Sequence, residues 1–192
     1  MTESRGSLII LSAPSGGGKT TLVTALRRRH PEFGYSVSAT TRPPRSGEQN
    51  GIDYFFLDVS TFQRKIEENA FAEWAEVHGH LYGTLRDQIH DRLNQGESIL
   101  MDVDVQGGIA LKKVFQDAIT IFILPVSMNV LEQRLRRRGT DDESIITQRL
   151  ETARTELTFS DQYDFQVIND RIDDVVKEIE AIINGINHSI KR

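Results

Sequence analysis

The chain contains no cysteine, one tryptophan and only five prolines among its 192 residues. Without cysteine it can form no disulfide bond and has no thiolate to act as nucleophile or metal ligand. No apolar run approaches the roughly 20 residues of a membrane-spanning helix. The first residues, MTESRGS, contain no basic stretch followed by an apolar stretch, so we expect no secretory signal. These absences favour a cytoplasmic protein with no membrane partner.

An excess of positive charge is also missing. Lysine and arginine number 23 against 28 aspartate and glutamate, which gives a net charge of -5. This balance argues against broad nucleic-acid binding. With 38% hydrophobic residues the chain has enough apolar material for a folded core. Its length suits one compact domain that carries insertions.

Short apolar segments alternate with helical patterns along most of the chain. Buried strands are predicted at residues 7–12, 98–105, 118–126 and 164–170. Helices are predicted at 20–30, 59–71, 85–97, 127–139, 140–157 and 171–186, with a loop and then a helix over 106–115. This alternation is typical of an α/β protein whose parallel sheet is covered on both faces.

Residues 36–86 depart from that alternation. They are rich in polar residues, with strands expected at 35–42 and 53–58 and a β-like stretch at 72–84. Ser60 or Thr61 is the expected cap of the helix between them. We therefore interpret this region as an insertion of antiparallel character in the parallel core.

The segment SAPSGGGKTT (12–21) lies between the first predicted strand and helix. It fits the phosphate-binding pattern GxxxxGK[ST] at Gly18, Lys19 and Thr20, with Ala13 at the place of the first glycine. Glycines let backbone N–H groups turn toward phosphate oxygens, and the helix adds its positive end. Lys19 would reach the phosphates, and Thr20 would ligate magnesium. An ordinary glycine-rich turn is the alternative, but motif, strand and helix coincide here.

Two more segments carry candidate chemistry. In MDVDVQG (101–107), Asp102 and Asp104 alternate with an apolar residue at a strand end, so we expect them to point the same way, toward a ligand or metal. A pair of solvated acids is the alternative. In residues 36–56, Arg42 and Arg45 could clamp a second phosphate with the hydroxyl of Tyr54. A polar hairpin with surface charges is the alternative there.

Over nearly its whole length the chain resembles the guanylate kinase family, the ATP-dependent GMP kinases among the nucleoside monophosphate kinases. The likeness rests on SAPSGGGKTTL, EWAEVHGHLYGT, DVDVQG, RRRGTDDESIITQRL and the long pattern SxTTRxxRxGExxGxDYxF. Alanine at the first loop glycine resembles bacterial members. The likeness implies a P-loop NTPase-type parallel sheet flanked by helices, with a core at 1–35, 87–128 and 160–192. It also implies a mixed GMP-binding insertion at 36–86 and a helical lid at 129–159.

The resemblance assigns roles to individual residues. The ATP site would comprise Ala13, Pro14, Ser15, Gly16, Gly17, Gly18, Lys19, Thr20, Thr21 and, near the adenine, Asn169. The GMP site would comprise Ser38, Arg42, Arg45, Glu48, Tyr54, Glu73, Tyr82, Thr84 and Asp104. Lys19, Arg45, Arg138 and Arg149 would be catalytic, and Thr20 and Asp102 would serve Mg²⁺. Arg134, Arg136 and Arg137 are expected to form only a solvated helix face.

Chemistry supports the guanine assignment. Guanine presents N1–H and a 2-amino group side by side, and one carboxylate such as Glu73 accepts both. Adenine would leave that carboxylate unpaired, at a cost of about 1–3 kcal/mol. The hydroxyls of Ser38 and Thr84 can donate to O6. The spacing alone does not distinguish Glu73 from Glu76; the family pattern does.

The implied reaction transfers the γ-phosphoryl group of ATP to GMP, and we expect dGMP to serve as a second acceptor. A non-catalytic guanylate-kinase-like scaffold module is one rival, disfavoured by the intact Lys19 and Thr20. A kinase for another nucleotide is a second rival. A GTPase is a third, disfavoured by the lack of an NKxD motif. The oligomeric state stays open, with a homo-oligomer among the alternatives.

Overall fold

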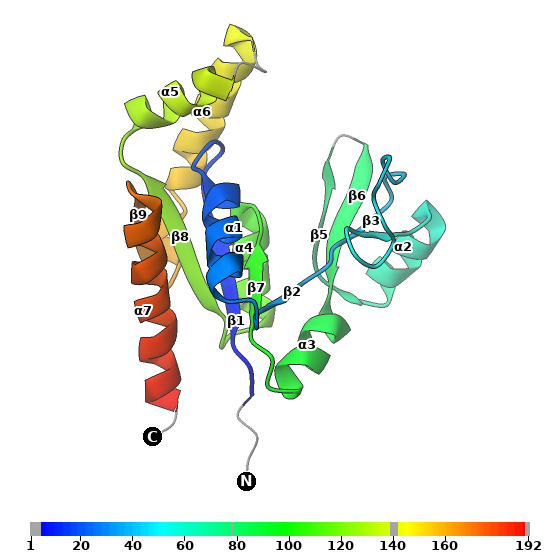
Figure 1. The fold of residues 1–192 in the computed structure, drawn as a ribbon. Coiled ribbons are helices and arrows are strands. Elements are labelled where there is room, and N and C mark those ends of the chain that lie inside the picture. Colours follow the sequence, from blue (N-terminus) through cyan, green and yellow to red (C-terminus); the bar gives the residue numbers. More distant parts are fainter. Residues whose placement is uncertain (1–4, 78, 139–141, 191–192) are drawn as a thin grey trace. The chain divides into compact units, whose positions relative to one another are not determined.

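The structure is a computed structural model, and it describes residues 5–77, 79–138 and 142–190 (Figure 1). The strands are β1 (Leu8–Ser12), β2 (Gly34–Tyr35), β3 (Ala39–Thr40), β4 (Phe55–Phe56), β5 (Phe71–Val77), β6 (His80–Leu85), β7 (Ile99–Asp102), β8 (Ile119–Pro125) and β9 (Phe165–Asn169). The helices are α1 (Lys19–Arg29), α2 (Val59–Glu67), α3 (Arg86–Asn94), α4 (Val105–Val114), α5 (Met128–Arg138), α6 (Glu143–Leu157) and α7 (Ile172–Ile190), with a 3₁₀ turn at Ser160–Gln162.

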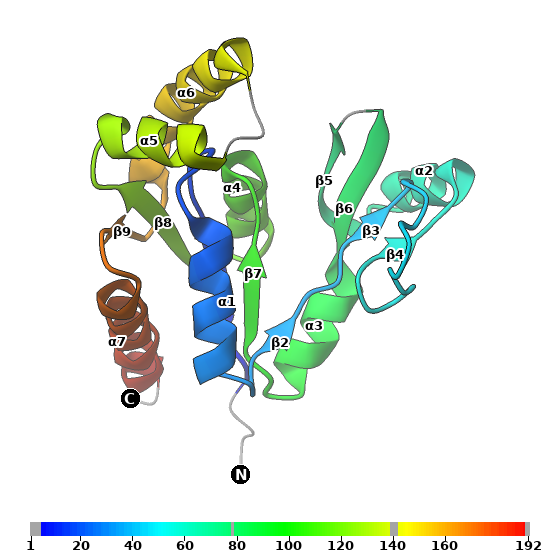
Figure 2. The ribbon, with the colours of Figure 1, turned by 45° about the horizontal axis from the view of Figure 1, so that its top comes forward.

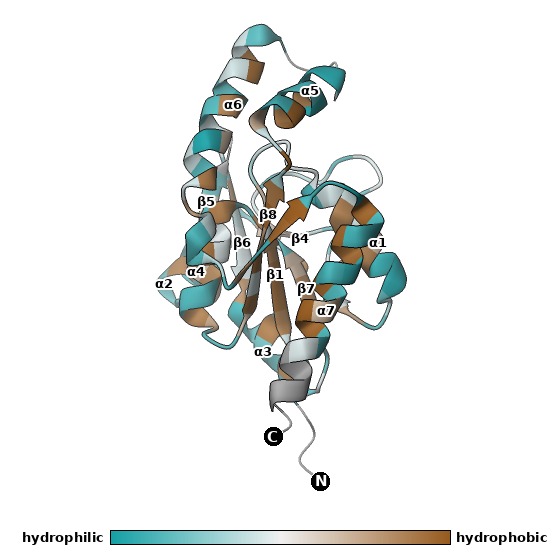
Figure 3. Ribbon diagram, turned by 90° about the vertical axis from the view of Figure 1, so that its left-hand side faces the viewer, coloured by the Kyte–Doolittle hydropathy of each residue, from teal (hydrophilic) through white to brown (hydrophobic). Residues whose placement is uncertain are grey.

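The larger sheet has five strands in the order β2-β7-β1-β8-β9. The pairings β1–β8, β2–β7 and β8–β9 are all parallel. Strand β1 is buried at every position, and Figure 3 shows the hydrophobic colour along β1 and β8. The α/β class with a parallel sheet and flanking helices, as the sequence predicted, is confirmed.

Apolar side chains from distant segments fix the helices on this sheet. Val105, Phe122 and Tyr163 form a buried cluster. The rings of Phe122 and Tyr163 meet edge to face, with centroids 5.1 Å apart. Helix α7 packs against both α1 and β9, and α5 packs against α6 (Figure 2). Burial of this kind, rather than helix propensity, is the main source of helix stability in such folds.

The second sheet has four strands in the order β4-β3-β6-β5. It is mixed, because β3 pairs parallel with β4 but antiparallel with β6, and β5 and β6 form an antiparallel hairpin. Its own core holds Ala39, Phe62 and Phe71, and the two phenylalanine rings stack at 4.3 Å. The prediction of a mixed sheet in addition to the parallel one is confirmed.

The chain divides into two compact units. The first unit comprises Met1–Leu8, Glu32–Met101 and Ala110–Asp117, and the second comprises Ile9–Pro31, Asp102–Ile109 and Ala118–Arg192. The finer division predicted from the sequence, with an insertion at 36–86 and a lid at 129–159, stays a prediction. No helix among the described residues is long and apolar enough to cross a membrane.

Several local predictions were wrong. The strand expected at 35–42 is two short pieces, β2 and β3, and β4 spans only Phe55–Phe56. Asp58, not Ser60 or Thr61, caps α2, since its carboxylate accepts the Thr61 N–H at 2.7 Å. The segment expected to be a loop after residue 105 is already helical, because α4 begins at Val105.

Candidate functional site

A glycine loop (residues 13–18) connects β1 to α1 in the second unit. Gly16 and Gly18 have φ values of +81° and +86°, a region that favours glycine. The Gly17 N–H donates to the Pro14 carbonyl at 2.8 Å, which tightens the turn. Gly18 is the N-cap of α1 and supplies no side-chain cap. The first N–H groups of α1 therefore have no partner within the helix and are suited to an anion.

Lys19, the first residue of α1, places its ammonium among acidic groups. Its Nζ donates to the Val103 carbonyl at 2.5 Å. Burial lowers the pKa of Lys19, and the charges of Asp102, Asp104 and Glu156 act in the opposite direction. A cation is thus fixed beside the glycine loop, where it can neutralise a phosphate.

A pocket in the second unit joins this loop to two carboxylates. It is lined by residues 13–20, Asp104 and Glu156. Glu156, near the end of α6, accepts the Ser15 N–H with Oε2 at 2.8 Å. Burial raises the pKa of Glu156, and the nearby charge of Asp104 raises it further. The hydrogen bond from the Ser15 N–H and the charge of Lys19 lower this pKa, but by less. The whole predicted ATP loop lies at this pocket except Thr21.

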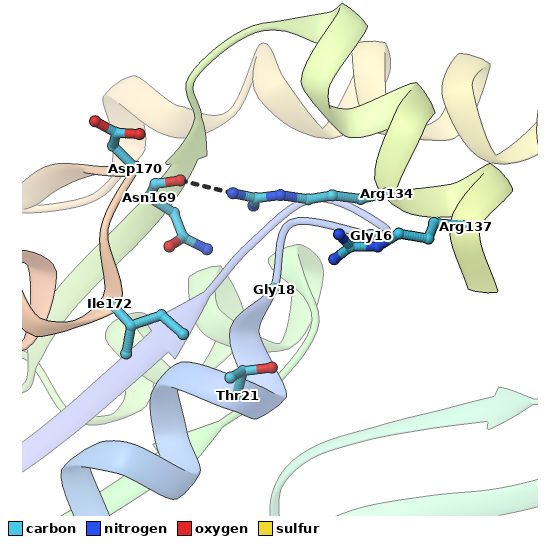
Figure 4. Close-up of a pocket in the computed structure, with 8 residues that line it drawn as sticks. All are labelled: Gly16, Gly18, Thr21, Arg134, Arg137, Asn169, Asp170 and Ile172. Atoms are coloured by element: carbon cyan, nitrogen blue, oxygen red, sulfur yellow. Dashed lines mark hydrogen bonds between the residues drawn. The ribbon is translucent and has the colours of Figure 1, made fainter.

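A second pocket of about 350 Å³ adjoins the other side of the loop (Figure 4). It is lined by Gly16, Gly18, Thr21, Arg134, Arg137, Asn169, Asp170 and Ile172. Asn169 donates from Nδ2 to the Gly17 carbonyl at 2.7 Å, and Arg134 donates to the Asn169 carbonyl at 3.0 Å. Asn169, predicted for the ATP site, is therefore held at the loop. The volume of the pocket is large enough for part of a small ligand.

This pocket corrects one prediction and exposes what the sequence reasoning missed. Arg134 was expected on a solvated helix face, yet it is half-buried and lines the pocket. Arg137 is exposed as predicted, but it also lines the pocket. Arg134 lies one helical turn before Arg138, so helix periodicity was the signal that could have selected it. Glu156 was also missed, although it lies seven residues after Arg149 on the same helix.

Asp102 and Asp104 do not alternate along a strand as predicted, because β7 ends at Asp102. Asp104 instead caps α4, since its Oδ1 accepts the Gly107 N–H at 2.7 Å. The Tyr163 hydroxyl, whose pKa burial raises to about 12, donates to the Val105 carbonyl at 2.9 Å. This bond ties the first turn of α4, and thus Asp104, to the core.

In the first unit, Arg42 and Glu48 form a two-pronged ion pair with distances of 3.0 and 2.8 Å. The Arg42 bond lowers the pKa of Glu48, and the backbone N–H of Arg45, which donates to Glu48 at 2.6 Å, lowers it further. The Arg45 residue itself is exposed. Glu48 thus fixes both the guanidinium of Arg42 and the chain at Arg45.

Aromatic rings surround the same guanidinium. It lies 5.4 Å from the ring centre of Tyr54 and 5.8 Å from that of Phe56. Tyr54 and Tyr82 meet edge to face at 6.0 Å. The hydrogen bonds that Arg42 donates to Glu48 raise the pKa of Arg42 most, and its hydrogen bond with Tyr82 raises it further. The structure therefore brings together Arg42, Tyr54 and Tyr82, three side chains predicted for the GMP site.

Glu73 and Thr84 face each other across the β5–β6 hairpin. They are register partners, and the Thr84 hydroxyl donates to Glu73 Oε1 at 2.6 Å. Thr84 is fully buried, and Glu73 and Ser38 are half-buried. Asp104, another residue predicted for the GMP site, belongs to the second unit.

The predicted lid arginines are described unequally. Arg149 lies on α6 and is half-buried. Arg138 ends α5, and its side chain lies outside the described residues.

The proposed metal ligands Thr20 and Asp102 offer the hard oxygen atoms that Mg²⁺ prefers. In the described part of the chain, no three His, Asp or Glu residues form a metal-binding group.

The parallel α/β fold, the glycine loop with its lysine and the Arg–Glu–Tyr cluster on a mixed sheet define a small kinase of the phosphotransferase class. The profile of the guanylate kinase family matches residues 5–185, and the chain belongs to that family. It is accordingly an enzyme that transfers a phosphoryl group.

Individual relatives agree with this assignment. A guanylate kinase of Chlorobium chlorochromatii (strain CaD3) is 45% identical over 182 residues, 94% of this chain and 96% of that protein. One of Synechococcus sp. (strain JA-3-3Ab) is 44% identical over 179 residues, 93% of this chain and 82% of that protein. The crystal structure of guanylate kinase from Anaplasma phagocytophilum aligns with a TM-score of 0.72 at 32% identity, covering 96% of this chain and 88% of that one.

Proposed function

We propose that this enzyme transfers the γ-phosphoryl group of ATP to the phosphate of GMP, producing ADP and GDP, with dGMP as a second acceptor. The observation that carries the proposal is the presence of both half-sites in one chain. One is a glycine loop with Lys19 beside it, and the other is the set of Arg42, Tyr54, Tyr82, Glu73 and Thr84.

The donor binds at the glycine loop of the second unit. The N–H groups at the start of α1 and the Lys19 ammonium hold the phosphates. The adenosine end occupies the pocket beside Asn169, where Arg134 and Arg137 also line the wall. These groups bind and orient ATP without covalent chemistry.

The acceptor binds in the first unit. Arg42, oriented by Glu48, pairs with the GMP phosphate together with Arg45 and the tyrosine hydroxyls. Glu73 accepts N1–H and the 2-amino group of guanine, and Ser38 and Thr84 donate to O6. Thr84 now donates to Glu73 at 2.6 Å, so this hydroxyl would turn to the base on binding. Asp104 is a further proposed guanine contact.

Magnesium fits the donor side, since Thr20 lies at the loop pocket and the charge of Asp102 reaches Lys19. When bound, the ion supplies a positive charge that offsets the repulsion between the two anionic substrates. We assign Thr20 and Asp102 to it. Removal of divalent ions with a chelator should abolish turnover, and added Mg²⁺ should restore it.

The reaction breaks the bond between the γ-phosphorus and its bridging oxygen while a GMP phosphate oxygen forms the new bond. Lys19, Arg45, Arg138 and Arg149 neutralise the charge between the two nucleotides. Closure of the predicted lid would bring its arginines to the phosphoryl group and exclude water. The role in purine nucleotide metabolism and the cytoplasmic location stay predictions.

The decisive experiment measures ADP formation from ATP and Mg²⁺ with GMP, dGMP, AMP, CMP, UMP or dTMP as acceptor. Turnover confined to GMP and dGMP is the expected result. Strong turnover of another nucleotide would overturn the guanine assignment while keeping the kinase. Saturable GMP binding without turnover would favour the scaffold-module alternative instead.

A further inference from the structure

Glu156 makes a contact that the proposed reaction does not use. Its carboxylate accepts the Ser15 N–H at 2.8 Å, although the two residues are 141 positions apart. Its side chain is half-buried and lines the loop pocket with Lys19 and Asp104. A charged acceptor makes a stronger bond to a backbone N–H than a neutral one. The end of α6 is therefore anchored to the glycine loop by a charge-assisted bond.

Helix geometry connects this anchor to a proposed catalytic residue. Glu156 and Arg149 are seven residues apart on α6, which is about two turns and about 10 Å along the axis. Ile146 lies one turn before Arg149, and Ala153 lies between Arg149 and Glu156; they are 4% and 0% exposed. The face of α6 that carries these residues is therefore the inward face. The Glu156 anchor thus fixes the distance of Arg149 from the Ser15 end of α6.

The Ser15 N–H is not one of the groups best placed for phosphate. Ser15 precedes both positive-φ glycines, Gly16 and Gly18, whereas the unpartnered N–H groups at the start of α1 follow them. The carboxylate therefore binds the outer part of the loop and leaves the helix end to an anion. This placement favours support of the loop over competition with the nucleotide.

We propose that Glu156 is a positioning residue for phosphoryl transfer: it holds the glycine loop through the Ser15 N–H and fixes the register of Arg149 on α6. This inference rests on the proposed function. Glu156 belongs to the predicted lid segment, and its role depends on the carboxylate oxygen that accepts the Ser15 N–H.

The first test compares Glu156→Ala with Glu156→Gln. The alanine variant should lose roughly ten- to a hundredfold in kcat/KM for ATP, because a displaced loop misorients the phosphates. The KM for GMP should change less than about twofold. The glutamine variant should keep most of the activity, since its amide oxygen can still accept the Ser15 N–H. Glu151→Ala, an exposed glutamate on the same helix, is the matched control.

The second test is a double-mutant cycle with Arg149→Ala. Because Glu156 acts partly through Arg149, the loss in kcat from both changes together should be smaller than the product of the two single losses. Thermal unfolding of each variant separates a misplaced loop from a destabilised protein.

Other outcomes would overturn the inference. They are additive losses in kcat, a Glu156→Ala variant as active as Glu151→Ala, an inactive glutamine variant that unfolds normally, and tighter ATP binding after loss of the carboxylate. The last would make Glu156 a competitor of the nucleotide. Failure of the proposed function would instead appear in the wild-type enzyme, as absent turnover of GMP.

Discussion

At the scale of single residues, the donor half-site depends on one buried cation. The Lys19 ammonium donates to the Val103 carbonyl, so this group is positioned before any nucleotide binds. Burial lowers the pKa of Lys19, and the charges of three acidic residues act against that shift. Electrostatic groups placed in advance lower the barrier because they need not reorganise during the reaction.

Lys19→Ala should therefore lower kcat by about 10²–10³-fold, the range for removal of one such group. Far-UV circular dichroism should be unchanged, because the side chain packs at the loop and not in the apolar core. Steady-state ADP formation measures the effect, with exposed Lys113→Ala on α4 as the control. Turnover within twofold of the wild type would remove Lys19 from the mechanism.

The acceptor half-site makes a second residue-scale prediction. Glu73→Gln replaces an acceptor oxygen with an amide donor, which cannot pair with the donors of guanine. We expect kcat/KM for GMP to fall about 10–100-fold, equivalent to about 1–3 kcal/mol of lost discrimination, with ATP affinity unchanged. Glu76→Gln, exposed on the same strand, is the control. Equal losses for both nucleotides would contradict the assignment.

At the scale of elements, apolar patterns predicted β1, β7 and β8 of the parallel sheet well because nearly all of their residues are buried. They failed in the first unit, where β2, β3 and β4 have two residues each and are defined by pairing partners far along the chain. The roles of Asp58 and Asp104 as caps depend on where each helix begins. Arg134 and Glu156 were missed for a similar reason, since their partners at Asn169 and Ser15 are distant in sequence.

The Asp58 cap gives a prediction about pH. Hydrogen bonds from the Ser60 hydroxyl, the Thr61 N–H and the Thr61 hydroxyl lower the pKa of Asp58 in the folded state. A lowered folded pKa contributes stability above the unfolded value of about 4, and that stability is lost as the pH falls toward the folded value. Asp58→Asn should therefore destabilise the protein most near neutral pH, and the difference should shrink in acid.

Urea unfolding at a series of pH values measures this effect. Asn retains an acceptor oxygen for the Thr61 N–H, so the variant isolates the charge from the cap geometry. Asp91→Asn, an exposed aspartate on α3, reports the loss of a surface carboxylate that caps no helix. A difference between Asp58→Asn and the wild type that grew as the pH fell would show that the carboxylate does not stabilise the helix.

At the scale of the whole molecule, the two half-sites belong largely to different compact units. Arg42, Tyr54, Glu73 and Thr84 lie in the first, and the glycine loop lies in the second. A ligand stabilises the part of a protein that it binds by RT ln(1 + [L]/Kd), about 2.7 kcal/mol at a hundredfold excess over Kd. Each nucleotide should therefore protect a different set of backbone amides from hydrogen exchange.

Hydrogen exchange with one nucleotide at a time tests this division. GMP alone should slow exchange in β3, β5 and β6, and a non-hydrolysable ATP analogue with Mg²⁺ should slow it in residues 13–20 and at the end of β9. Opening of each unit is a separate local event, so protection up to about a hundredfold is expected there. Glu73→Gln should remove only the GMP effect, and Lys19→Ala should weaken only the effect of the analogue. If GMP protected the glycine loop but not the β5–β6 hairpin, the assignment of GMP to the first unit would be wrong, because the Glu73–Thr84 pair lies in that hairpin.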